Sequence, residues 1–184
     1  MKILVSNDDG IAANGIRCLT ETLAQEHKVY VIAPDRERSA AGHSLTLHTP
    51  LRVEEVEAYH GVKRAWVTTG TPGDCVKIGI NAILSKEEQP DIVISGINHG
   101  PNLGADILYS GTVSCAMEGH TFVIAGIHIT QYSFLQLFCS AWNTWRINEI
   151  CFRDVYKRQG LHYLSTNVIP FQCLDYLNLN FALF

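Results

Sequence analysis

Short apolar runs rich in β-forming residues recur along the first 120 residues, and helical patterns separate them. The runs at 2–6, 29–33 and 91–95 are mostly apolar, which is typical of strands that are covered on both faces. Between the first two runs, residues 15–26 place apolar side chains on one helical face. This strand-helix-strand order predicts an α/β fold with a mostly parallel sheet and helices on both faces.

The other elements follow from local signals. Thr71-Pro72-Gly73-Asp74 has a capping threonine, a proline at the first helical position and an acid at the third, so it predicts the start of a helix that runs through Leu84. The remaining expectations are strands at 51–56, 65–69 and 122–129, a long loop at 96–109, and a helix that begins at Ser110 or Gly111.

Three polar clusters directly follow predicted strands, at 7–10, 35–44 and 95–98. The carboxyl ends of parallel strands meet at one edge of a sheet, and ligands of such folds bind there. We therefore expect the three clusters to converge on one site.

The first cluster contains two adjacent carboxylates, Asp8 and Asp9. Adjacent like charges raise one another's pKa, and a divalent cation removes that cost. Together with Ser39 and Asn98 they offer a set of hard oxygen ligands that suits Mg²⁺ or Mn²⁺. The alternative is that the two aspartates only cap the following helix or shape a turn.

A second candidate element is the helix start at Ser110, Gly111 and Thr112. Free backbone N–H groups and the positive end of the helix dipole favour an anion there, so these residues are candidates for phosphate binding. An ordinary helix cap is the alternative. His99 is a candidate acid or phosphate donor, and Arg36 and Arg38 are candidate anion ligands, although all three also fit solvated loops.

Composition and absent motifs exclude several classes. The net charge of −4 disfavours a basic surface for nucleic acid, and no apolar run approaches the length of about 18 residues that a membrane span needs. The start of the chain is unlike a secretory signal, and the six cysteines are scattered without a C-x-x-C pair, so we expect reduced thiols in the cytoplasm. The sequence lacks the motifs of α/β-hydrolases, P-loop NTPases and dinucleotide dehydrogenases.

Residues 131–184 differ in character from the rest. The segment from 121 onward holds 13 of the 17 aromatic residues, and its apolar residues keep no clear period. We expect an α/β core at 1–130 and an atypical tail at 131–184. The tail is either an aromatic subdomain or oligomer contact, or a frameshifted or mis-joined stretch; residues 153–159 resemble translated adapter sequence.

Five blocks resemble the SurE family of survival nucleotidases, in the order of that family. They are MKILVSNDDG at 1–10, VIAPDRERSAAGH at 31–43, TTGTPGD at 68–74, DIVISGINHGPNLG at 91–104 and YSGTVSCAMEG at 109–119. The resemblance implies a Rossmann-like three-layer sandwich. It also implies metal-dependent hydrolysis of nucleoside 5′- and 3′-monophosphates, with short polyphosphate as a further substrate, and a cytoplasmic homodimer or homotetramer.

The resemblance further implies that Asp8, Asp9, Ser39 and Asn98 are the metal ligands, and it ends at about residue 130. Our hypothesis is hydrolysis of a phosphomonoester by an activated water, with Asp8 or Asp9 orienting that water. One alternative is a haloacid-dehalogenase-like phosphatase with an aspartyl nucleophile, although that class separates its two aspartates by one residue. Another is a non-catalytic nucleotide-binding module or an inactive truncated copy.

Overall fold

The computed structural model describes residues 1–100, 102, 104–122, 125–130 and 136–138. The strands are β1 (Lys2–Ser6), β2 (Lys28–Pro34), β3 (Val53–Val56), β4 (Arg64–Thr68), β5 (Ile92–Asn98), β6 (Ala125–Thr130) and β7 (Gln136–Phe138). The helices are α1 (Asn14–Leu23), α2 (Pro72–Ile78) and α3 (Gly111–Thr121), with a π-helical turn η1 (Gly79–Ile83) and a 3-10 helix η2 (Gly104–Leu108).

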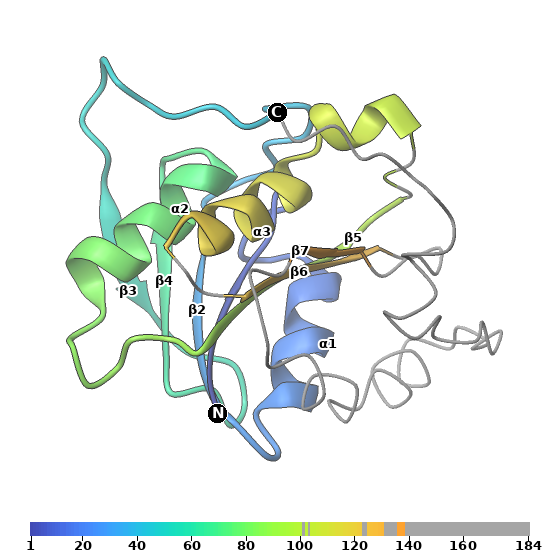
Figure 1. Ribbon diagram of the computed structural model, residues 1–184. Helices are drawn as coiled ribbons and strands as arrows, with labels where there is room; N and C mark the ends of the chain where they lie inside the picture. The colour runs from blue at the N-terminus through green and yellow to red at the C-terminus, as the bar shows by residue number, and fades with distance from the viewer. Residues whose placement is uncertain (101, 103, 123–124, 131–135, 139–184) are drawn as a thin grey trace, which may run out of the picture.

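In this part of the chain the strands form one sheet in the order β3-β4-β2-β1-β5-β6-β7 (Figure 1). The five central strands are parallel, and β3 and β7 pair antiparallel at the two edges. β1 lies at the centre, where Ile3 pairs with Val29 of β2 on one side and with Ile92 of β5 on the other. The expected α/β class with a mostly parallel sheet is confirmed.

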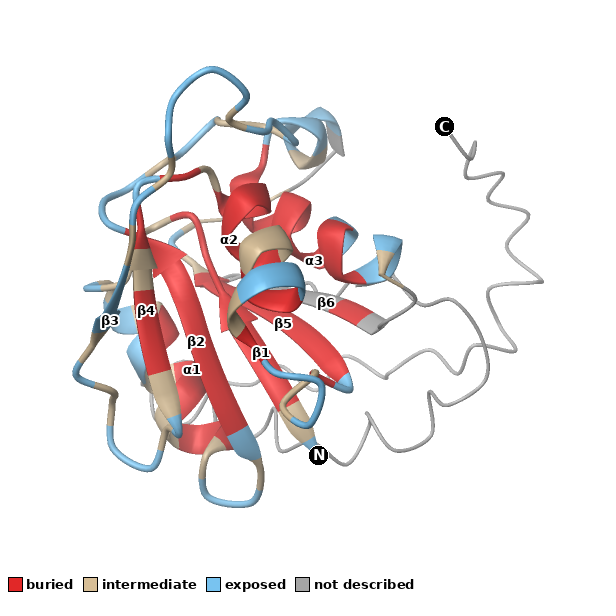
Figure 2. Cartoon of the chain, turned by 90° about the vertical axis from the view of Figure 1, so that its left-hand side faces the viewer, coloured by how far each residue is buried: buried red, intermediate tan, exposed pale blue. Residues whose placement is uncertain are grey.

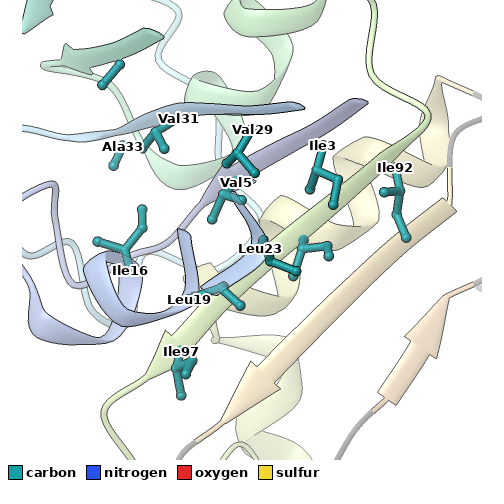
Figure 3. Close-up of a cluster of buried hydrophobic side chains, with 12 residues drawn as sticks. Ile3, Val5, Ile16, Leu19, Leu23, Val29, Val31, Ala33, Ile92 and Ile97 are labelled. Atoms are coloured by element: carbon teal, nitrogen blue, oxygen red, sulfur yellow. The ribbon is translucent and has the colours of Figure 1, made fainter. Parts of the chain in front are cut away.

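Each face of the sheet carries its own apolar cluster, because successive side chains of a strand point to opposite faces. On one face, Ile16, Leu19 and Leu23 of α1 pack against Ile3 and Val5 (Figure 3). On the other face, Leu4 packs among residues of β2, β4, α2 and α3. The central strands are consequently buried along most of their length (Figure 2), and the arrangement has three layers.

Several element boundaries differ from the sequence expectation. The helix expected through Leu84 is α-helical only to Ile78 and continues as the π-helical turn η1, where Gly79 lies close against Leu4 and Ile32. Residues 96–109 are not one loop, because η2 occupies their second half and β5 extends to Asn98. The extension follows from pairing, since β5 meets β6 again at Asn98 after an irregularity that begins at Ser95.

The strand β7 lies in a segment whose sequence favours neither a helix nor a strand. It adds to the edge of β6 in antiparallel pairing, so a tertiary contact rather than a local pattern defines it. Apart from 136–138, the expected atypical tail at 131–184 lies outside the described residues. Among the helices that the structure describes, none combines the length and the apolar character needed to cross a membrane.

Candidate active site

The first two polar clusters follow β1 and β2, the third forms the carboxyl end of β5, and all three meet at one cavity of about 1050 Å³. All four expected metal ligands line it: Asp8, Asp9, Ser39 and Asn98. The parallel pairing of β1 with both β2 and β5 explains the convergence, because it brings the carboxyl ends of the three strands together. Thr112 of α3 links the first and third clusters, because its hydroxyl contacts Asp8 Oδ1 and lies 3.2 Å from Asn98 Oδ1.

The turn after β1 is held by Asn7. Its amide Nδ2 donates to the Gly10 carbonyl at 3.0 Å, and its Oδ1 accepts from the Gly10 N–H at 3.2 Å. Gly10 has a φ of 94°, which glycine adopts without the strain that a side chain would cause. This closed turn fixes the backbone on which Asp8 and Asp9 sit.

Asp8 is the more enclosed of the two carboxylates, with 4% of its surface exposed. Burial is the main cause of its raised pKa, and the neighbouring charge of Asp9 adds to it, while the hydrogen bond from Thr112 acts in the opposite direction. The repulsion expected from adjacency is therefore present, but desolvation is the larger effect. A cation beside Asp8 would stabilise the ionised form that burial disfavours.

Asp9 is half-buried, and its Oδ2 accepts a hydrogen bond from the His99 backbone N–H at 3.1 Å. Its pKa is also raised, first by burial and then by the charge of Glu37, against the effect of the His99 hydrogen bond. The carboxylate that acts on Asp9 thus comes from the second cluster. The site therefore combines the negative charge of Glu37 from the second cluster with that of the two aspartates from the first.

The second cluster is attached to the first through its backbone. The Arg38 N–H donates to the Asp8 carbonyl at 2.7 Å, which places the neighbouring Ser39 beside the cavity. The Ser39 hydroxyl donates to Glu37 Oε1 at 2.6 Å. At the far end of the same cluster, His43 Nε2 lies 2.7 Å from Oε1 of Glu118, a buried residue of α3.

The start of α3 is close to Asp8. A Cβ atom on Gly111 would come within 2.6 Å of Asp8 Cβ, so only glycine fits without a shift of the backbone. Ser110 is the helix cap, because its hydroxyl accepts from the Val113 N–H at 3.1 Å, and it also lines the cavity. The Thr112 hydroxyl is buried and bonded to Asp8 and Asn98. A role of this helix start in phosphate binding stays a prediction.

The oxygen donors on this cavity fit a hard divalent cation. Two carboxylates with raised pKa, a serine hydroxyl and an amide carbonyl face the same space, and such ligands suit Mg²⁺ or Mn²⁺. Within the described ranges no group of three or more His, Cys, Asp or Glu side chains is arranged to hold a metal. A cation at this cavity would thus rely on Ser39 and Asn98 beside the two aspartates.

Sequence reasoning missed Glu37 and the contacts of Thr112. Glu37 stands two positions before Ser39, and both residues line the same cavity. The signal in the sequence was the place of Glu37 within the second polar cluster. The contact of Thr112 with Asp8 joins positions 104 residues apart, and nothing local to either residue indicates it.

The family model described as "Survival protein SurE" matches residues 3–182 of the chain. The chain belongs to the SurE family. A "5'-nucleotidase SurE" of Synechococcus sp. (strain JA-3-3Ab) is 55% identical over 137 residues, which are 73% of this chain and 52% of that protein. One of Trichodesmium erythraeum (strain IMS101) is 60% identical over 121 residues, covering 65% of this chain and 44% of that protein.

Among solved structures, the SurE protein from Aquifex aeolicus matches with a TM-score of 0.58 and 48% identity, over 66% of this chain and 47% of that one. The chain spans about half the length of the SurE relatives it matches. The family model extends into residues 131–182, whereas the alignments with these relatives cover 65–73% of the chain.

Proposed function

We propose that this SurE chain hydrolyses nucleoside 5′-monophosphates to nucleoside and phosphate. The observation that carries the proposal is that Asp8, Asp9, Ser39 and Asn98 line one cavity. Its relatives bear the name 5'-nucleotidase SurE. The cavity volume of about 1050 Å³ is at the upper end of the range for small-molecule sites, which is about 300–1000 Å³, and leaves room for a nucleotide.

Asp8, Asp9, Ser39 and Asn98 would hold a divalent cation, Mg²⁺ or Mn²⁺. When bound, such a cation polarises a phosphoryl oxygen and lowers the pKa of a nearby water. The chain's own residues prepare the site for it: the Asn7 turn fixes the two aspartates, and Thr112 orients the Asp8 carboxylate.

Asp8 or Asp9 would also orient the attacking water, since both are carboxylates at the cavity wall. The phosphate would lie against the start of α3, where Ser110 lines the cavity and the first N–H groups of Gly111 and Thr112 favour an anion. Charge that develops on the phosphoryl oxygens would be stabilised there by donors that are already in position.

Three further properties belong to the proposal: additional substrates, an assembly and a location. Nucleoside 3′-monophosphates and short polyphosphate present the same terminal phosphoryl group, so the site would also accept them. A homodimer or homotetramer is the proposed assembly, and the cytoplasm is the proposed location. Two of the cysteines in the described part, Cys75 and Cys115, are buried free thiols, which supports a reducing environment.

The direct test is release of phosphate from a nucleoside 5′-monophosphate with added Mg²⁺ or Mn²⁺. The Asp8→Asn variant should lose activity by at least about 100-fold, because stabilisation by a metal amounts to several kcal/mol. Asp91→Asn is the matched control, because that carboxylate contacts the Lys2 backbone at the opposite end of the sheet. Full turnover by Asp8→Asn would remove Asp8 from the proposed ligand set.

Two other outcomes would select the alternative interpretations. A trapped phospho-aspartate at Asp8 or Asp9 would favour an aspartyl nucleophile. Nucleotide binding without metal and without phosphate release would favour a binding module or an inactive copy.

A further inference from the structure

A second cavity lies on the other side of the segment that carries Ser39. It has a volume of about 350 Å³, and we call it the arginine cavity because Arg36, Arg38 and Arg52 line it, together with Thr49 and Thr69. It shares no lining residue with the larger cavity that holds Asp8 and Asp9. The two cavities are therefore separate sites.

The segment 36–39 divides the two cavities by alternation. Glu37 and Ser39 line the larger cavity, whereas Arg36 and Arg38 line the arginine cavity. These four residues run from a bend to a turn after β2, and neighbouring positions line different cavities. The segment thus places one acidic residue, Glu37, at the larger cavity and two basic residues, Arg36 and Arg38, at the arginine cavity.

The arginine cavity has an excess of positive charge. Its lining includes three guanidinium groups, which are always charged in proteins, and no acidic side chain. Among the ion pairs of the described residues, Arg36 and Arg38 share a single carboxylate, Asp35, whose Oδ1 lies 3.4 Å from Arg38 Nη2 and 3.9 Å from Arg36 Nε. One carboxylate cannot neutralise three guanidiniums, so the concentration of positive charge stands out in a chain of net charge −4.

Arg38 is fixed in place and still has a donor to offer. Its Nη2 donates to the Thr69 carbonyl at 2.8 Å, which anchors the guanidinium between the segment after β2 and the residue after β4. Its Nε is buried and has no hydrogen-bond partner among the described residues. An unpartnered buried donor costs free energy, so a ligand oxygen that reached it as the guanidinium adjusts would be stabilised there.

We propose that the arginine cavity binds a phosphate oxyanion at a site separate from the candidate active site. Arginine suits this ligand because its planar fork donates two parallel hydrogen bonds to a phosphate and its charge strengthens both. The threonine hydroxyls of the lining supply neutral donors beside the guanidiniums. Inorganic phosphate and the phosphate group of a nucleotide share this chemistry.

The test is a calorimetric titration of inorganic phosphate into the full chain at low salt, with divalent cations removed by EDTA. The Arg36→Gln/Arg52→Gln double variant should bind phosphate about tenfold more weakly or worse, because two charge-assisted contacts are lost. The Lys63→Gln/Lys86→Gln double variant removes the same charge at exposed positions outside both linings, so it should bind as the unaltered chain does.

Equal affinity in the arginine variant, or an equal loss in the lysine variant, would overturn the proposal. Circular dichroism checks folding of each variant. An Arg36→Lys/Arg52→Lys variant keeps the charge but loses the forks, and it should show intermediate affinity. Affinity equal to that of the unaltered chain would contradict recognition by the arginine forks.

A second titration, with a nucleoside 5′-monophosphate under the same conditions, separates the two sources of phosphate. A nucleotide affinity that exceeds that of inorganic phosphate and falls in the arginine variant would identify a nucleotide as the ligand. Equal or weaker nucleotide binding would identify free phosphate. Neither titration measures hydrolysis, so failure here is distinguishable from failure of the proposed nucleotidase function.

Discussion

At the scale of single residues, the position of Asp8 depends on two neighbours at the start of α3. Gly111 allows the helix to approach because it has no side chain, and Thr112 contributes a hydroxyl that holds the carboxylate. Both residues are buried and lie in close contact with Asp8, so a small change at either residue should shift the Asp8 carboxylate.

Gly111→Ala should lower phosphate release by about 100-fold, because a methyl group 2.6 Å from Asp8 Cβ displaces the carboxylate from its working position. Steady-state kinetics would measure it. Gly73→Ala is the control at the first turn of α2, where the new Cβ meets its nearest atom at 3.4 Å, an ordinary contact. Similar rates for both variants would show that the close approach at Gly111 does not matter.

Thr112→Val keeps the size of the side chain and removes its hydroxyl. We expect kcat to fall by about tenfold or more, because a hydrogen bond to a charged group contributes about 1.5–3 kcal/mol. Thr112→Ser retains the donor and should recover most of the activity. If valine and serine behaved alike, the hydroxyl would have no role in holding Asp8.

The four expected ligands could be chosen from the sequence because their residue types and their places after strands are local features. The parallel order of those strands was also predictable, and with it the convergence on one cavity. The contact of Thr112 with Asp8 was not, because it depends on how α3 packs against the turn after β1, 104 positions earlier. How strongly burial raises the pKa of Asp8 depends on the same packing.

At the scale of elements, α2 begins with a capping box that the sequence predicted. Thr71 Oγ1 accepts from the Asp74 N–H, and Asp74 Oδ2 accepts from the Thr71 N–H at 2.9 Å. Burial raises the pKa of Asp74, but the hydrogen bonds from Thr46 and Thr71 together outweigh it, so the pKa lies below its usual value. Asp74 thus joins the start of α2 to the loop before β3.

Asp74→Asn should reduce the free energy of unfolding at neutral pH by about 1 kcal/mol. A depressed folded-state pKa gives stability that is present above the unfolded pKa of about 3.9 and is lost as pH falls through the folded pKa. The difference between the two proteins should therefore shrink below about pH 4, as urea titrations across pH would show. A constant difference across that range would contradict the assignment.

The loop at 35–44 is tied to α3 by His43 and the buried Glu118, which also has Lys77 Nζ at 3.7 Å. His43→Ala should lower the free energy of unfolding by about 1–3 kcal/mol, because it removes a partner of a buried carboxylate. It should also speed cleavage by trypsin after Arg36 or Arg38. His43→Gln can still donate to Glu118 and should be cleaved more slowly than His43→Ala. Equal cleavage of all forms would mean that the contact does not restrain the loop.

At the scale of the whole molecule, the site depends on a sheet that is covered on both faces. Ile94 is fully buried in β5, the strand whose last residue is Asn98. Ile94→Ala should cost about 2–5 kcal/mol of unfolding free energy, and Ile94→Val about 0.5–1.5. Chemical denaturation would measure both. A loss below about 1 kcal/mol for alanine would mean that this face of the sheet is less tightly packed than described.

The alternation of strands and helices was enough to predict the parallel sheet, and a strand was expected where the edge strand β3 lies, but the edge strand β7 was not expected. β7 depends on pairing with β6, and the end of β5 depends on the same neighbour. Such long-range pairing is not encoded in any local pattern. The proposed homodimer or homotetramer is also a property of the whole molecule. The chain spans about half the length of the SurE relatives it matches.

The most direct test of the proposed metal site is a calorimetric titration of Mn²⁺ into the chain and into one variant from each cluster: Asp8→Asn, Ser39→Ala and Asn98→Ala. If the three clusters hold one cation, the unaltered chain binds Mn²⁺ at a single site, and every variant weakens that same site. Weakening by Asp8→Asn alone, with Ser39→Ala and Asn98→Ala binding as the unaltered chain does, would contradict a cation held between the clusters.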